Sequence, residues 1–280
     1  MTRSAIFGLA LWFAKAAAFA QVSEPVDCVQ MQGDLTPGGL VWARVAPGSR
    51  ATVNGEALVV LADGTTLFGL GRDATSPIAL TVEGPQACER EIAISPREYN
   101  VQRIEGVPQN TVTPPAELTE RIARERALVG AAKGQNIERP DLWAAAKAGF
   151  SWPATGRISG VYGSQRIYNG TPRSPHYGID IAIPTGTPVY APAPGVVTLA
   201  EPDLFYSGGT VILDHGYRLS SSFLHLSKLH VAVGQELEAG ELLGEVGASG
   251  RATGPHLDWR MSWRSHRVDP QLLVPPMPKP

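Results

Sequence analysis

The stretch Pro175-His-Tyr-Gly-Ile-Asp180 carries a histidine and a carboxylate on either side of a glycine, directly ahead of an apolar run. The apolar residues at 179–183 predict a β-strand. The side chain of Asp180 can therefore lie on the same face of the sheet as a ligand from a neighbouring strand. Gly178 lets the chain bend between His176 and Asp180. Imidazole nitrogen and carboxylate oxygen both suit Zn²⁺, and the stretch therefore predicts part of a metal site.

Two later segments supply further groups of the same kind. His256 and Asp258 are two residues apart, so in a strand their side chains point to one face. His225 lies between Leu224 and Leu226, a polar residue within an apolar stretch. A single histidine of this sort is more often a structural group. Because a catalytic zinc site needs three protein ligands and an open position for water, the combination favours a metal site.

The region around these residues predicts strands and turns from Phe150 to the end of the chain. No long amphipathic helix interrupts this part of the sequence, which favours a mainly antiparallel sheet folded over a groove. The expected strands lie in the segments 156–163, 188–199, 209–214, 219–225, 242–246 and 256–263.

The first half of the chain predicts a different unit. Regularly spaced turn signals between short apolar segments over 22–109 predict a small β-sandwich. The sandwich contains no set of metal ligands or nucleophiles, so a support or docking module is expected, with carbohydrate binding as a weaker alternative. A charged helical connector over 111–134 and a short helix over 141–148 follow. The expected strands of the sandwich are 39–45, 57–61, 65–70, 78–82 and 91–94.

Residues 1–20 predict an export signal. Arg3 gives a positive start, 5–14 is apolar, and Ala18-Phe19-Ala20 offers small residues at a cleavage site. Lys15 interrupts the apolar run, which is too short to span a membrane. The alternative is a cytosolic chain with an apolar N-terminal helix. The full division predicted from the sequence is a signal peptide at 1–20, a sandwich-like domain at 21–109, a helical linker at 110–150 and a C-terminal domain at 151–280.

Composition agrees with an exported globular protein. Hydrophobic residues make up 43% of the chain and charged residues 18%, which excludes a disordered chain. The formal net charge of −2 gives no general attraction to nucleic acid or anionic lipid. In an oxidising compartment the two cysteines, Cys28 and Cys88, form a disulfide by default. Metal ligation by both cysteines is the weaker alternative, because no further cysteines exist.

The motifs together resemble the LytM/lysostaphin-type zinc metallopeptidases over roughly 157–270. The matching segments are His176-Tyr-Gly-Ile-Asp180-Ile-Ala, Pro188-Val-Tyr-Ala-Pro, Asp214-His-Gly, His225-Leu-Ser-Lys-Leu-His, Val231-Ala-Val-Gly and Gly247-Ala-Ser-Gly-Arg-Ala-Thr-Gly-Pro-His-Leu257. The resemblance implies a β-rich groove, one zinc ion and cleavage of peptide bonds in peptidoglycan cross-bridges. By this resemblance His176, Asp180 and Asp258 are the metal ligands, and His225 and His256 are the catalytic histidines.

Asp258 departs from the family pattern, which has histidine at this position. Aspartate is an accepted zinc ligand, but it adds negative charge and is shorter than histidine. The expected function is a zinc-dependent endopeptidase of peptidoglycan peptides in the periplasm or cell envelope. The alternative is a degenerate domain that binds wall peptides or activates another cell-wall hydrolase without cutting. The remaining histidines, His215, His230 and His266, are expected to be structural or exposed.

Overall fold

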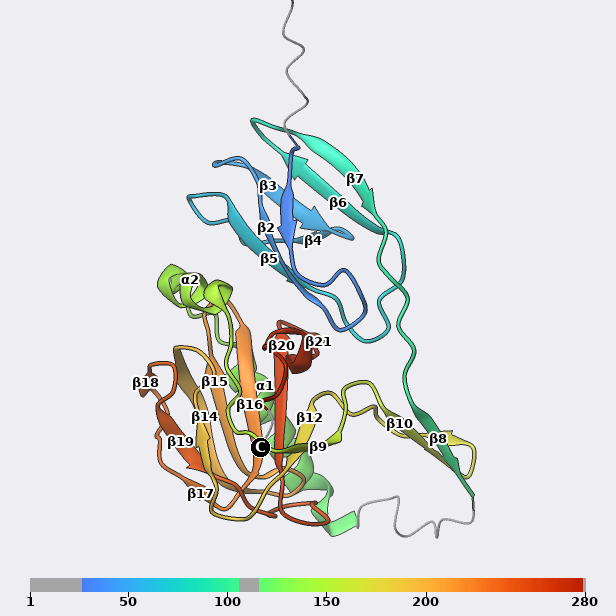
Figure 1. Ribbon diagram of the computed structural model, residues 1–280, viewed down its shortest axis with the longest axis vertical. Helices are drawn as coiled ribbons and strands as arrows, with labels where there is room; N and C mark the ends of the chain where they lie inside the picture. The colour runs from blue at the N-terminus through green and yellow to red at the C-terminus, as the bar shows by residue number, and fades with distance from the viewer. Residues whose placement is uncertain (1–26, 106–115, 279–280) are drawn as a thin grey trace, which may run out of the picture.

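The computed structural model describes residues 27–105 and 116–278. The chain is mainly β, as the sequence predicts, and an N-terminal sandwich stands above a large C-terminal sheet (Figure 1). In the described ranges, no helix combines the length and the apolar character that a membrane crossing requires. The predicted signal peptide lies outside the described residues.

The N-terminal sandwich consists of two antiparallel sheets, with the strand orders β1-β2-β5 and β4-β3-β6-β7. Alternate residues of β6 are buried and form one core with the buried apolar residues of β2 and β5. The strand predicted over 57–61 is wrong beyond Ala57, because the Leu61 N–H bonds to Thr65 O in a turn. The strands are β1 Gln30–Gln32, β2 Leu40–Arg44, β3 Arg50–Val53, β4 Glu56–Ala57, β5 Thr65–Gly69, β6 Ile78–Glu83 and β7 Cys88–Ile92.

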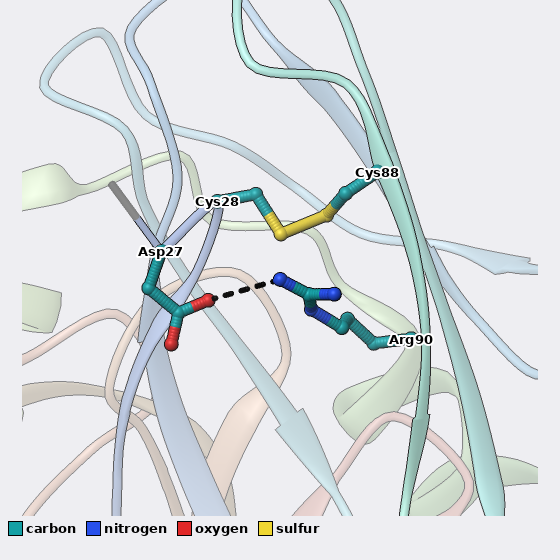
Figure 2. Close-up of a disulfide and its surroundings, with 4 residues drawn as sticks. All are labelled: Asp27, Cys28, Cys88 and Arg90. Atoms are coloured by element: carbon teal, nitrogen blue, oxygen red, sulfur yellow. Dashed lines mark ion pairs between the residues drawn. A yellow bond between two sulfur atoms is a disulfide. The ribbon is translucent and has the colours of Figure 1, made fainter. Parts of the chain in front are cut away.

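The predicted disulfide between Cys28 and Cys88 is present and joins the start of the described chain to strand β7 (Figure 2). The two cysteines are 60 residues apart. Asp27 and Arg90 form an exposed ion pair beside the bridge, with 3.7 Å between Asp27 Oδ1 and Arg90 Nη2. The bridge therefore closes nearly the whole sandwich into one covalent loop.

The two helices predicted between the sheets are both present. The first is η2 (Ala116–Leu118) followed by α1 (Thr119–Gly134), while 111–115 lie outside the described residues. Helix α1 is more than a connector, because it lies against one face of the large sheet (Figure 1). Helix α2 (Pro140–Ala148) contributes Trp143, whose ring contacts Trp42 of the sandwich. The Trp143 indole N–H also donates to Gly216 O, so α2 joins the two halves of the molecule.

The large sheet is antiparallel, with the order β18-β14-β15-β16-β20-β12-β9, and β21 pairs with the free part of β20. One face is an apolar core that includes the fully buried Ile181, Leu257 and Trp259. A three-stranded sheet of order β13-β19-β17 adjoins it. The strands are β9 Arg157–Gly160, β12 Ile179–Ala182, β13 Pro188–Tyr190, β14 Gly195–Leu204, β15 Gly208–Asp214, β16 Leu219–Leu226, β17 Lys228–Leu229, β18 Glu236–Leu237, β19 Leu242–Glu245, β20 Leu257–Trp263 and β21 His266–Val268; the short helix η3 is Pro270–Leu272.

A further three-stranded sheet, which the sequence did not indicate, extends to one side of the large sheet (Figure 1). Strand β8 (Val101–Ile104) leaves the sandwich and pairs in parallel with β10 (Gln165–Tyr168), which pairs in turn with β11 (Thr171–Pro172). This hairpin ends four residues ahead of His176. The chain from the sandwich is thus hydrogen-bonded to the segment that leads into the predicted metal site.

Candidate metal centre

The predicted ligands meet on the polar face of the large sheet. Asp180 in β12 lies directly opposite Asp258 in β20, so both side chains project from the same face. Gly160 of β9 lies on the other side of Asp180. A Cβ atom on Gly160 would lie 2.2 Å from Asp180 Oδ2, so only glycine leaves room for this carboxylate. The pairing of three adjacent strands therefore fixes the position of Asp180.

His176 completes a group of three ligand atoms. Its Nε2 lies 3.1 Å from Asp180 Oδ1 and 3.6 Å from Asp258 Oδ2. Its Nδ1 lies 3.3 Å from Val161 O, which directs Nε2 toward the carboxylates. Nε2 of His176 and Oδ1 of Asp180 are buried and make no hydrogen bond of good geometry with a described residue.

Unsatisfied buried polar atoms are costly, and here they belong to groups that ligate metals and converge within 4.8 Å. The residues therefore fit a divalent cation, and one nitrogen with two carboxylate oxygens suits Zn²⁺. Without a cation the three groups interact with one another. Burial alone lowers the pKa of His176, but the nearby carboxylates of Asp180 and Asp258 outweigh it and raise the pKa to about 10.

The two histidines predicted to be catalytic lie side by side next to this group. The rings of His225 and His256 are 4.7 Å apart between centroids. His225 Nδ1 is 2.8 Å from Ser249 O, and His256 Nδ1 is 2.8 Å from Gly254 O. The Nε2 atom of each histidine can therefore take part in proton transfer. His256 Nε2 lies 3.8 Å from Asp180 Oδ1.

His225 also has a backbone conformation that is rare for a residue with a side chain. Its φ is +63°, in the left-handed region, and the adjacent pairing of β15 with β16 is irregular between Gly209 and Val211. Such positions persist where the surrounding structure enforces them, often at functional sites. Burial lowers the pKa of His225, so its imidazole is neutral at neutral pH.

Asp258 has a partner that the sequence analysis missed. Both of its oxygens accept hydrogen bonds from Arg260, with Arg260 Nε 2.9 Å from Oδ1 and Nη2 in contact with Oδ2. Burial by itself raises the pKa of Asp258, but the Arg260 charge dominates and holds the pKa well below its usual range. A Cβ on Gly178 would lie 2.5 Å from Arg260 Cγ, so this glycine makes room for the pair. In the sequence, the signal for this pair is that Asp258 and Arg260 are two residues apart, which places both side chains on one face of a strand.

The other histidines lie elsewhere. His215 is buried and hydrogen-bonded at both ring nitrogens, to Pro194 O and Ser221 Oγ. His230 pairs with Glu245, and His266 pairs with Glu56 of the sandwich.

Comparison with known proteins agrees with the geometry. The model of peptidase family M23 matches residues 174–270, the range that holds all five predicted site residues. The crystal structure of a peptidase M23 from Pseudomonas aeruginosa is 31% identical to the chain, with a TM-score of 0.65, and the alignment covers 85% of this chain and 94% of that one. The chain belongs to peptidase family M23. Its relatives in this family are zinc metallopeptidases.

Curated relatives of this M23 peptidase match less than half of the chain. The peptidoglycan DD-endopeptidase ShyA of Vibrio cholerae is 38% identical over 122 residues, which are 43% of this chain and 28% of the relative. The DD-carboxypeptidase/endopeptidase Mpg of Neisseria meningitidis is 38% identical over 104 residues, which are 37% of this chain and 24% of the relative. The chain thus spans only about a quarter of the length of these relatives.

Proposed function

We propose that this M23 peptidase is a zinc-dependent endopeptidase that hydrolyses peptide cross-links of peptidoglycan. The observation that carries the proposal is the convergence of His176, Asp180 and Asp258, with two orphaned ligand atoms, beside His225 and His256. The names of the two curated relatives support a bond between D-configured residues as the target.

His176, Asp180 and Asp258 would hold the zinc, which supplies a Lewis acid for the scissile carbonyl and a more acidic water. His225 and His256 are the proton-handling groups in this proposal. Because the Nδ1–H of each donates to a backbone carbonyl, each Nε2 has a lone pair that can accept a proton. Once protonated, either Nε2–H can stabilise developing negative charge on oxygen or donate to the leaving amine.

Asp258 serves in this proposal as the third ligand, with Arg260 as its counter-charge. A carboxylate oxygen has two lone pairs, so Asp258 can accept from Arg260 and still ligate a metal. The guanidinium offsets the negative charge that aspartate adds where the family pattern has neutral histidine. The charge-balanced Asp258–Arg260 pair is the feature that makes the unusual ligand compatible with a catalytic zinc ion.

The proposal includes a location in the cell envelope. The relatives named for peptidoglycan, the disulfide and the predicted leader at 1–20 all support it. The division at 21–109, 110–150 and 151–280 belongs to the same proposal, with the first part as a support or docking module.

The test is digestion of purified sacculi by the purified chain. Release of soluble peptides that stops with a chelator and returns with added zinc is the expected result. No release at any zinc concentration, with a folded protein, would contradict the proposal.

One observation favours a second candidate, a non-catalytic M23 domain that binds wall peptides or activates another hydrolase. Asp258 is already paired on both oxygens with Arg260. If this pair withholds Asp258 from the metal, purified protein will contain no zinc and will bind sacculi without releasing peptide. Metal analysis of the purified chain separates the two candidates.

A further inference from the structure

Three cationic side chains surround Ser262 on the face of the sheet that carries the metal centre. Ser262 is four residues after Asp258 in β20 and projects from the same face. Lys133, in the last turn of α1, donates to Ser262 Oγ at 3.3 Å. Arg260 precedes Ser262 by two residues on this face, and Arg267 of β21 lies directly opposite Ser262.

Only one of the three cations forms an ion pair with a carboxylate among the described residues. Asp258 pairs with Arg260, and neither Lys133 nor Arg267 forms an ion pair with a described residue. In the described chain no acceptor lies against Nη1 of Arg260, whose other nitrogens bind Asp258. Burial, together with the neighbouring guanidinium groups, lowers the pKa of Lys133, and burial lowers that of Arg267 as well. Partly desolvated positive charge in this excess favours an anion.

Buried hydroxyl groups lie beside these cations. Ser222 lies directly opposite Arg260; its side chain is 3% exposed, and its Oγ has no hydrogen-bond partner among the described residues. Ser220 Oγ lies 3.1 Å from Ser262 Oγ. A buried hydroxyl without a partner, beside an arginine with a free nitrogen, is a donor set that suits a carboxylate.

Helix α1 sets the position of the cluster relative to the metal centre. Ala132 of α1 packs on Ile212, which lies opposite Ser222, and Ser222 lies opposite Arg260. Helix α1 therefore covers the sheet face next to Arg260. Ser262 lies four residues beyond Asp258, which is about 13 Å along the strand, the length of about four extended residues of a bound peptide. A peptide whose scissile bond lies at the metal centre would place its next residues against Lys133, Arg260 and Arg267.

We propose that Lys133, Arg260 and Arg267 form a subsite for a carboxylate of the substrate peptide, about two to four residues from the scissile bond. This inference rests on the proposed peptidase function for its orientation. The subsite selects wall peptides that have a free carboxylate on that side of the cleaved bond over peptides in which it is amidated.

The experiment uses the full chain made zinc-free with a chelator, so that binding is measured without hydrolysis. The probes are a synthetic pentapeptide ending in D-alanyl-D-alanine with a free C-terminal carboxylate, and the same peptide as its carboxamide. We expect the wild type to bind the carboxylate form about tenfold more tightly, the scale of one charge-assisted hydrogen bond. Lys133→Met and Arg267→Met should each remove most of this ratio.

Controls separate the subsite from a structural role. Arg126→Met removes an exposed cation from the same helix and should leave the ratio unchanged. Lys133→Arg keeps the positive charge and should restore the ratio, and melting temperatures identify variants that fail to fold. Inorganic phosphate is tested as a competitor, and it should displace the carboxylate peptide from the wild type but not alter binding of the carboxamide.

Equal binding of the two peptides by the wild type, or an undiminished ratio in both Met variants, would overturn the subsite. Discrimination in the zinc-free protein without release of peptide from sacculi would instead overturn the proposed hydrolysis and leave the subsite intact. With active zinc-loaded enzyme, the Met variants should raise KM for the carboxylate substrate and leave kcat nearly unchanged.

Discussion

The N-terminal sandwich and the large C-terminal sheet are both antiparallel, yet they bury different kinds of side chain. In the described sandwich the buried polar residues are neutral: Ser49, Thr65 and Thr66. The large sheet buries ionisable groups, including Asp214, His225 and Asp258. Burying such groups is costly unless they are paired or neutralised. The difference locates the chemistry in the C-terminal sheet and leaves the sandwich as a unit held by apolar packing and a disulfide.

The largest expected effect comes from removing a predicted ligand. His176→Ala deletes the nitrogen that faces both carboxylates, so zinc affinity should fall on the order of 10³-fold or more, given typical zinc-site free energies. Chelator competition measures the affinity, and sacculus digestion should fall to background. His230→Ala, which removes a histidine paired with Glu245 outside the centre, is the matched control and should keep its zinc. Wild-type zinc affinity in His176→Ala would refute the ligand assignment.

The converse experiment removes the disulfide. Replacing Cys28 and Cys88 by serine opens a loop of 60 residues, and the unfolding free energy of the sandwich should fall by about 4 kcal/mol. Denaturant titration measures this loss. Zinc affinity should change less than twofold. A large loss of zinc binding would show that the metal centre depends on the sandwich, and the contrast between the two regions would fail.

Arg260→Met should produce a smaller effect that depends on the metal. Without the guanidinium, the buried Asp258 keeps only His176, with Nε2 3.6 Å from Asp258 Oδ2, as a counter-charge in the zinc-free protein, which should cost about 2 kcal/mol of stability. Zinc would supply the missing positive charge. The rise in melting temperature on adding zinc should therefore be larger in Arg260→Met than in the wild type. An equal or smaller rise would indicate that Arg260 does not offset the charge of Asp258.

The smallest expected effect concerns Asp214, a buried carboxyl remote from the metal centre. Burial raises its pKa to about 7, against the Gly216 N–H and the charge of Arg218. A folded-state pKa above the unfolded value of about 3.9 means that this group favours folding at low pH and loses that contribution as pH rises toward 7. The Asp214→Asn variant has no group to ionise at this position and avoids this loss. Its unfolding free energy relative to that of the wild type should therefore increase between about pH 4 and pH 7.

Denaturant titrations of both proteins at several pH values measure this trend. The neighbouring His215, whose pKa is lowered to about 4 by burial, titrates with the opposite sign but is present in both proteins and cancels in the comparison. A relative stability that stays constant or falls with pH would contradict the burial of a neutral Asp214.

Much of this arrangement follows from local sequence rules. Strand alternation predicts that His256 and Asp258 share a face, and Gly178 lets the chain bend between His176 and Asp180. The mainly β fold and the pairing of Cys28 with Cys88 are confirmed. The five site residues do come together, although their roles stay a prediction.

Features that depend on distant pairing were not predicted. Strand β8 and its partner β10 are short and polar and lie about 60 residues apart in the sequence. No apolar pattern therefore predicts their parallel pairing. The sequence of helix α1 predicts a charged connector, and only its contacts with Ile212 and Ser262 show that it covers the sheet face that carries the metal centre. The spacing of Arg260 and Asp258 was enough to predict that they pair. The strength of the pairing depends on the burial of Asp258, which the sequence does not show.

A crystal structure of the zinc-loaded chain tests the central claim most directly. We expect one zinc ion about 2.0–2.2 Å from His176 Nε2 and from one oxygen each of Asp180 and Asp258, with Arg260 still bound to Asp258. A zinc ion held without Asp258, or a zinc-soaked crystal in which the three groups remain free of metal, would contradict it.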